Sequence, residues 1–149
     1  MAGTIVVGVD GSTESLRALG WSLAEADRRD AEVVAVIAWV PNPVPSSATP
    51  FTMADPVDLG VDHEKVHRER LDEAITEVTG GGEHPVRTVV RQGYAGDVLT
   101  EEAAQADLLV VGSHGHGRLY SAVLGSTSTE CIRKATCPVV VIPPKLVPR

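Results

Sequence analysis

The sequence predicts one α/β domain built on a doubly wound, parallel β-sheet with helices on both faces. Strand-like and helix-like segments alternate along almost all of the 149 residues, a pattern typical of parallel strands joined by right-handed helical crossovers. The predicted strands are short, continuous runs of β-branched residues, as expected for strands that are covered on both faces. Because aromatic residues make up only 3% of the chain, the core is expected to consist of aliphatic side chains.

The first part of the chain supplies two strands and the helix between them. Residues 4–9 and 32–40 are nearly continuous apolar runs and predict buried strands. Ser12 or Thr13 is expected to cap the intervening helix, with Glu14 and the other charged residues mostly away from its buried stripe. That stripe recurs at helical spacing and consists of Leu16, Leu19, Leu23 and Ala26.

The middle of the chain predicts an irregular excursion followed by a second helix. Residues 41–61 carry five prolines, which lack the backbone donor that a strand or helix interior requires. A helix is expected over residues 62–79, and the three glycines at 80–82 end it. Its predicted buried stripe is Val66, Leu71, Ala74, Ile75 and Val78.

The second half predicts three further strands, at residues 86–91, 106–111 and 138–142. A short helix is expected at 97–105, between the first two of these strands. A glycine- and serine-rich turn follows the middle strand and leads into helical sequence that reaches about residue 135. The short helix is expected to bury Val98, Leu99 and Ala103.

Glycine-rich and polar residues follow the predicted first and fourth strands, at 8–12 and 112–118. Ligands of open parallel sheets bind beyond the carboxyl ends of the strands. Glycine can take positive φ and lets a ligand approach the backbone, so Gly112, Gly115 and Gly117 are expected to curl the chain with its N–H groups inward. Together with the helix N-terminus at Ser126, these groups predict a concave site for phosphate oxygens.

Several side chains near this edge are candidates for ligand contacts. Ser126 and Ser128 offer hydroxyl donors, and Arg118 offers a charge-assisted contact to phosphate. Asp10 would repel phosphate and suits a ribose hydroxyl or the adenine edge; the alternatives are a helix-capping residue or an Asx turn. Trp39 follows the second strand and is a candidate for the adenine end.

The histidines do not predict a metal centre. His114 and His116 alternate on a loop without further ligands and are expected to face solvent or lie near phosphate. His63 and His67 share the i, i+4 spacing of metal-binding helices, but the glutamate and third ligand of a zinc protease are absent. Both, like His84, are expected at the surface.

The spacing Gly112-x2-Gly115-x9-Gly125-Ser126 resembles the signature of nucleotide-binding universal stress proteins. Residues 7–12 resemble the first strand and turn of that family, and residues 137–141 resemble its last strand. The resemblance covers nearly the whole chain and is weakest across residues 41–61.

The resemblance implies a Rossmann-like sheet of order 3-2-1-4-5 that binds ATP, with Mg²⁺ or Mn²⁺ left open, across the ends of strands one and four. It also implies a homodimer that pairs its fifth strands through Val139, Val140, Val141 and Ile142. The implied contacts to adenine and ribose are Gly8, Val9, Asp10 and Ala38. The implied contacts to ribose and phosphates are Gly112, Ser113, His114, Gly115, His116, Gly117 and Arg118, with Gly125, Ser126 and Thr127 at the outer phosphates.

The sequence favours a regulatory nucleotide-binding protein of stress response over an efficient enzyme. It lacks the Gly-x4-Gly-Lys loop of phosphoryl-transfer proteins. Residues 9–12 also differ from the Ser-Gly-Gly-x-Asp-Ser loop of related ATP pyrophosphatases. Slow ATP hydrolysis is left open. The alternatives are cyclic AMP as the ligand, or a nucleotide-free dimeric interaction module.

Charge and composition narrow the partners further. A formal net charge of −7 disfavours nucleic acids and anionic membranes. Cys131 and Cys137 lack metal-site spacing and are expected to be reduced thiols. No secretory signal or transmembrane segment is visible, which favours the cytoplasm. Residues 1–144 are expected to form the domain, and 145–149 resemble the remnant of a cleaved tag.

Overall fold

In the part of the chain that the structure describes, five parallel strands form a single sheet in the order β3-β2-β1-β4-β5, which confirms the predicted topology. The structure is a computed structural model that describes residues 3–41, 60–114 and 124–144. From β1 in the centre, the chain winds outward through β2 to β3 and then returns to add β4 and β5 on the other side. The strands are β1 (Thr4–Gly8), β2 (Glu32–Trp39), β3 (Val86–Gln92), β4 (Leu108–Gly112) and β5 (Val139–Ile142).

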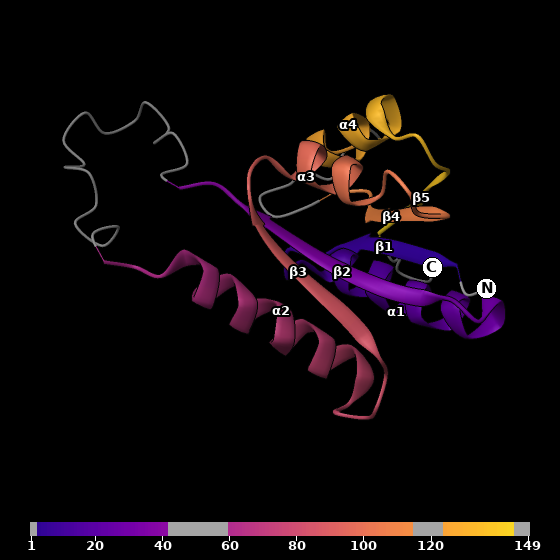
Figure 1. Cartoon of the computed structure of the whole chain (residues 1–149), viewed down its shortest axis with the longest axis horizontal. Coiled ribbons are helices and arrows are strands. Elements are labelled where there is room, and N and C mark those ends of the chain that lie inside the picture. The colour runs from indigo at the N-terminus through magenta and orange to yellow at the C-terminus, as the bar shows by residue number, and fades with distance from the viewer. Residues whose placement is uncertain (1–2, 42–59, 115–123, 145–149) are drawn as a thin grey trace, which may run out of the picture.

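Two layers of helices enclose the sheet, as predicted (Figure 1). In the described part of the chain, α1 and α2 pack on one face, and α3 and α4 pack on the other. No helix in these ranges is long and apolar enough to cross a membrane. The helices are α1 (Thr13–Arg29), α2 (His63–Thr79), α3 (Ala95–Glu102) and α4 (Ser126–Lys134).

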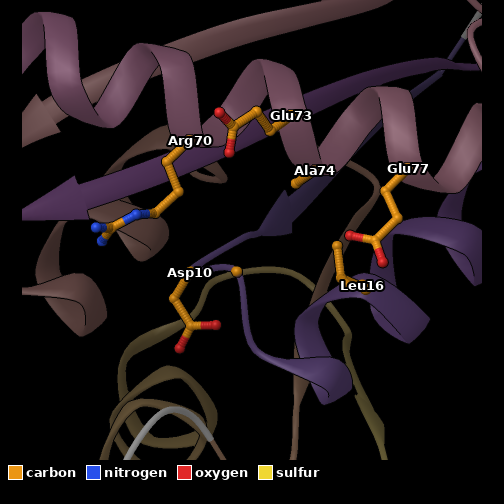
Figure 2. A pocket seen from close by; sticks show the side chains of 7 residues that line it. Asp10, Leu16, Arg70, Glu73, Ala74 and Glu77 are labelled. Atoms are coloured by element: carbon orange, nitrogen blue, oxygen red, sulfur yellow. The ribbon is translucent and has the colours of Figure 1, made fainter.

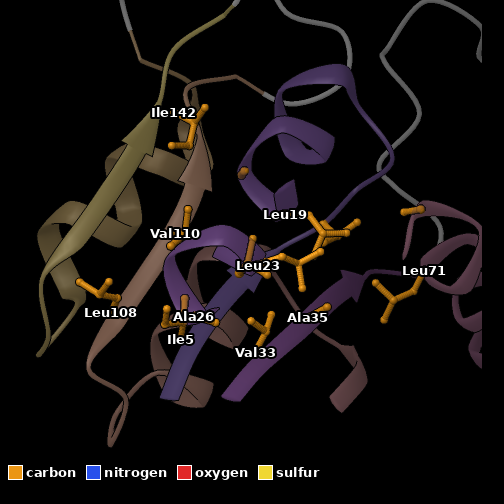
Figure 3. Packing of buried hydrophobic residues seen from close by; sticks show 14 of the residues in the cluster. Ile5, Leu19, Leu23, Ala26, Val33, Ala35, Leu71, Leu108, Val110 and Ile142 are labelled. Carbon is orange, nitrogen blue, oxygen red and sulfur yellow. The ribbon is translucent and has the colours of Figure 1, made fainter. Parts of the chain in front are cut away.

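Alternate residues of each central strand enter different halves of the core. Ile5 of β1 and Val33 of β2 belong to the cluster beneath α1 and α2 (Figure 3). Their neighbours Val6 and Val34 belong to the cluster beneath α3 and α4. All four side chains are almost completely buried. The continuous apolar runs are therefore explained by a sheet that is covered on both faces.

Helix α1 begins where the sequence predicts, but its first turn is more buried than expected. The Ser12 hydroxyl accepts a hydrogen bond of 3.2 Å from the amide of Ser15, which caps the helix. Glu14 was expected away from the buried stripe, yet it is only 3% exposed. The reason is that the start of α1 packs closely against Gly112 at the end of β4.

The first turn of α2 corrects two further predictions. Leu71 and Ala74 are buried as expected, and Ile75 and Val78 pack against the same core; Val66, however, is 41% exposed. His63 and His67, expected at the surface, are half-buried and stack on Trp39. These imidazoles join the start of α2 to Trp39 at the end of β2.

Helix α3 starts two residues earlier than predicted because the chain turns sharply just before it. Gly93 has a φ of 146°, a conformation that favours glycine, and Tyr94 then forms the N-cap. The expected burial of Val98, Leu99 and Ala103 is confirmed. Strand β4, in contrast, begins and ends slightly later than predicted, at Leu108 and Gly112.

Cys131 lies on α4 and Cys137 lies between α4 and β5, and both are free thiols, as predicted. Burial raises the pKa of Cys131 to about 11, and burial also raises the pKa of Cys137. Both side chains are therefore protonated near neutral pH and contribute to packing as small apolar groups.

Candidate functional site

The candidate site lies at the carboxyl ends of β1 and β4, which are neighbours in the sheet. Asp10 follows β1 and Ser113 follows β4. Within the sheet, β2 and β3 lie to one side of β1, and β4 and β5 lie to the other. This is the point where the winding direction reverses, the usual ligand position in open α/β sheets.

The turn after β1 holds the Asp10 carboxylate in a defined position. Its Oδ1 accepts a hydrogen bond of 2.8 Å from the amide of Ser12, so the Asx turn that the sequence left open is present. The turn needs Gly11, whose φ is 87°. The amide of Asp10 donates to the Ser15 hydroxyl at 3.2 Å. Asp10 is half-buried at the edge of the sheet.

Gly8, Val9 and Ala38 reach the same edge on β1 and β2. Gly8 pairs with Val36, and Val9 donates its amide hydrogen to the Val36 carbonyl at 2.9 Å. The Val9 side chain is buried in the core. Val9 therefore has neither its amide hydrogen nor its side chain available to a ligand, whereas Gly8 and Ala38 are half-buried strand residues.

Hydrogen bonds join the end of β4 directly to the start of α4. The Ser113 carbonyl accepts from the Gly125 amide at 2.7 Å and from the Ser128 hydroxyl at 3.1 Å. The Ser113 hydroxyl lies 3.1 Å from Nδ1 of His114. The structure thus brings together the two polar segments that the sequence assigned to one site.

These bonds correct the expected roles of two donors. Ser128 is only 1% exposed and its hydroxyl points inward to the Ser113 and Gly125 carbonyls, so it does not face a ligand. The amide hydrogen of Gly125 is already used. The N-cap residue of α4 is Gly125, which has no side chain to cap the helix, and the first backbone donors of a helix have no intrahelical partner. The donors at this end are therefore expected at Ser126 and Thr127.

The structure requires a glycine at position 112 for a different reason from the one predicted. Positive φ occurs at Gly11 in this region, and Gly112 ends β4 with ordinary strand geometry. A Cβ built on Gly112 would lie 2.8 Å from the Cβ of Glu14, so the glycine permits close packing against α1. Residues 115–118, which carry Gly115, His116, Gly117 and Arg118, lie outside the described residues.

A cavity of about 480 Å³ adjoins the β1 turn on the side of α1 and α2. Figure 2 shows Asp10 and Leu16 facing the side chains of α2 across this space. Sequence reasoning missed the α2 residues, although their i, i+3, i+4, i+7 spacing marks one helix face. Three carboxylates and one guanidinium line the cavity, which makes it unsuitable for phosphate. The lining residues are Asp10, Gly11, Leu16, Arg70, Glu73, Ala74 and Glu77.

The fold and the site define a doubly wound α/β protein with a ligand edge between its first and fourth strands. The model of the universal stress protein family matches residues 1–143, and the chain belongs to this family. Universal stress protein Rv2624c of Mycobacterium tuberculosis is 39% identical over 145 residues, which cover 96% of this chain and 49% of that protein. A universal stress protein of Mycolicibacterium smegmatis is 32% identical over 139 residues, covering 93% and 47%.

Solved structures agree with the fold. A universal stress protein in complex with cAMP has a TM-score of 0.68 at 26% identity and covers 95% of this chain and 96% of its own. The UspA protein of Lactobacillus plantarum has a TM-score of 0.74 at 23% identity, with coverage of 94% and 97%. This chain spans about half the length of the curated relatives it matches.

Proposed function

We propose that this chain is a regulatory protein that binds an adenine nucleotide, with ATP as the first candidate, at the edge between β1 and β4. The observation that carries the proposal is the attachment of α4 to the end of β4 through the Ser113 carbonyl. It holds a helix N-terminus whose N-cap residue is a glycine next to the end of β4, the sheet neighbour of the strand that leads to Asp10. Helix N-termini stabilise phosphate through free N–H groups and the helix dipole.

The charged side chains near the proposed site indicate which part of the nucleotide binds at each end. The phosphates are placed at Ser126 and Thr127, because the carboxylates of the cavity would repel them. The ribose is placed at Asp10, whose carboxylate accepts hydrogen bonds from hydroxyl groups. Among the described residues, no three His, Cys, Asp or Glu side chains group closely enough to hold a metal ion. Any Mg²⁺ or Mn²⁺ that accompanies ATP is therefore expected to be held mainly by the phosphates.

A second candidate ligand is cyclic AMP, because a solved structure with 26% identity is a complex with cAMP. Both nucleotides would bind at the adenine and ribose positions, whereas only ATP would also reach the outer phosphate positions at Ser126 and Thr127. A steady-state ATP turnover above about one per second would favour an enzyme instead, since typical enzymes exceed this rate.

We also propose that the chain forms a homodimer through β5. Val139, Val140 and Val141 lie on an outer strand with one neighbour in the sheet. An apolar edge of this kind presents unpaired backbone groups that a second copy can satisfy by antiparallel pairing.

Replacing Asp10 with asparagine tests the ribose position. The amide oxygen of asparagine can still accept from the Ser12 amide, so the turn and the fold are expected to remain. Losing the charged acceptor is expected to weaken ATP binding about tenfold, since hydrogen bonds to charged groups contribute roughly 1.5–3 kcal/mol. Calorimetric titration measures the affinity.

Asp62→Asn is the matched control, because the Asp62 carboxylate also accepts a backbone hydrogen bond just before a helix, from the amide of Lys65 at 3.1 Å. It is expected to leave the affinity unchanged. Equal affinities for the two variants, or tighter binding by Asp10→Asn, would show that Asp10 does not hold the ribose.

A further inference from the structure

Trp39, His63 and His67 form an aromatic cluster, here called the Trp39 cluster, where the end of β2 meets the start of α2. The ring centroids of Trp39 and His63 are 4.8 Å apart with planes at 17°, and those of Trp39 and His67 are 5.6 Å apart at 15°. The two imidazole centroids are only 6.3 Å apart. A sandwich around the indole would separate them much further, so both imidazoles lie on the same face of Trp39, side by side.

A hydrogen bond fixes the protonation of one imidazole. Nδ1 of His67 lies 2.7 Å from the carbonyl oxygen of His63. A carbonyl only accepts, so Nδ1 carries the hydrogen and the lone pair of the neutral ring is on Nε2. Histidines that bind metals are oriented in the same way, with the other ring N–H donated to a carbonyl or carboxylate.

We propose that His63 and His67 form a two-histidine site for a divalent transition metal ion that prefers imidazole, such as Cu²⁺, Ni²⁺ or Zn²⁺. The i, i+4 spacing places both rings on one face of the helix. The ion binds Nε2 of His67 and one ring nitrogen of His63. This site is separate from the proposed nucleotide edge and does not depend on it.

The geometry of the cluster accommodates one shared ion. A metal–nitrogen bond of about 2.0–2.1 Å places each ring centroid roughly 3 Å from the ion, so two bound imidazoles have centroids at most about 6.5 Å apart. The observed 6.3 Å is just within this limit. The two rings must therefore turn toward each other when the ion binds, so that the angle at the ion can approach the tetrahedral value.

The residues around His63 and His67 indicate a moderate affinity for the metal ion. No third His, Cys, Asp or Glu joins the pair in the ranges that the structure describes, so water completes the coordination. The flanking charges are of both signs: Asp62 and Glu64 favour a cation, and Lys65 and Arg68 oppose it. Arg68 forms an ion pair of 3.2 Å with Glu64, which offsets part of its repulsion. Cu²⁺ and Ni²⁺ are expected to bind more tightly than the earlier first-row ions.

The test is a titration of the full chain with Ni²⁺ at neutral pH, without nucleotide, followed by calorimetry and by tryptophan fluorescence. One equivalent is expected to bind and to quench the emission of Trp39. His67→Gln and His63→Gln are each expected to weaken binding at least tenfold. His84→Gln changes an exposed histidine outside the cluster and is expected to bind as the unchanged protein does.

A measurement on the unchanged chain tests the site without depending on the folding of any variant. Bound Ni²⁺ is paramagnetic and is expected to broaden the ring resonances of His63 and His67 before those of the other histidines. Broadening of other histidines alone, quenching that survives His67→Gln, or equal loss in His84→Gln would each overturn the proposal.

Discussion

Gly115→Val is expected to lower the affinity for ATP at least about 100-fold, equivalent to about 2.7 kcal/mol, while the protein remains folded. Gly115 belongs to the glycine pattern that resembles the signature of nucleotide-binding universal stress proteins, and it lies outside the described residues. In the proposed site the backbone must approach the phosphates closely, and a β-branched side chain would occupy that space. Calorimetric titration with ATP, together with a thermal melt, separates loss of binding from loss of fold.

Gly82→Val is the control for this change. Gly82 lies in the exposed turn between α2 and β3, where the nearest atom to an added Cβ is the Thr79 carbonyl oxygen at 3.4 Å. This variant is expected to bind ATP normally. If Gly115→Val folds and binds ATP as tightly as the control, the loop after β4 does not hold the phosphates.

Gly112→Ala is expected to destabilise the protein by about 1–3 kcal/mol, the usual cost of overpacking a tight contact. The added Cβ would lie 2.8 Å from the Cβ and 3.0 Å from the backbone carbon of Glu14. Neither atom is the end of a flexible side chain, so α1 or β4 must shift. Denaturant unfolding measures the loss.

Gly20→Ala makes the same change inside α1 and is expected to act in the opposite direction. The nearest atom to its added Cβ is Cγ1 of Val78 at 3.6 Å, an ordinary contact. Alanine in a helix interior is favoured over glycine by roughly 0.5–1 kcal/mol. A variant Gly112→Ala as stable as Gly20→Ala would contradict the close packing of α1 on the end of β4.

The sequence predicts the sheet and its helices well because their signals are local and repeated. Apolar runs such as residues 32–40 require burial on both faces, and only a parallel sheet between helix layers provides it. Start signals at helix ends are equally local, as Ser12 shows. The strand order came from the resemblance to a family, since periodicity does not determine which strands are neighbours.

Three of the corrections share one cause: they depend on contacts between residues far apart in the sequence. Glu14 is buried by the end of β4, and His63 and His67 are half-buried against Trp39. Ser128 turns inward because Ser113, fifteen positions earlier, offers a carbonyl. The pattern around each of these polar residues is that of a solvent-exposed face, so sequence reasoning could not find their burial.

The central claim is that the edge between β1 and β4 binds an adenine nucleotide, and calorimetric titration of the nucleotide-free full chain tests it most directly. ATP, ADP, AMP and cyclic AMP are titrated separately. We expect saturable binding of one nucleotide per chain, with ATP favoured over AMP because the proposed site places the outer phosphates at the N-terminus of α4. An absence of binding heat with all four nucleotides, confirmed at a second temperature, would contradict the claim and leave a nucleotide-free interaction module.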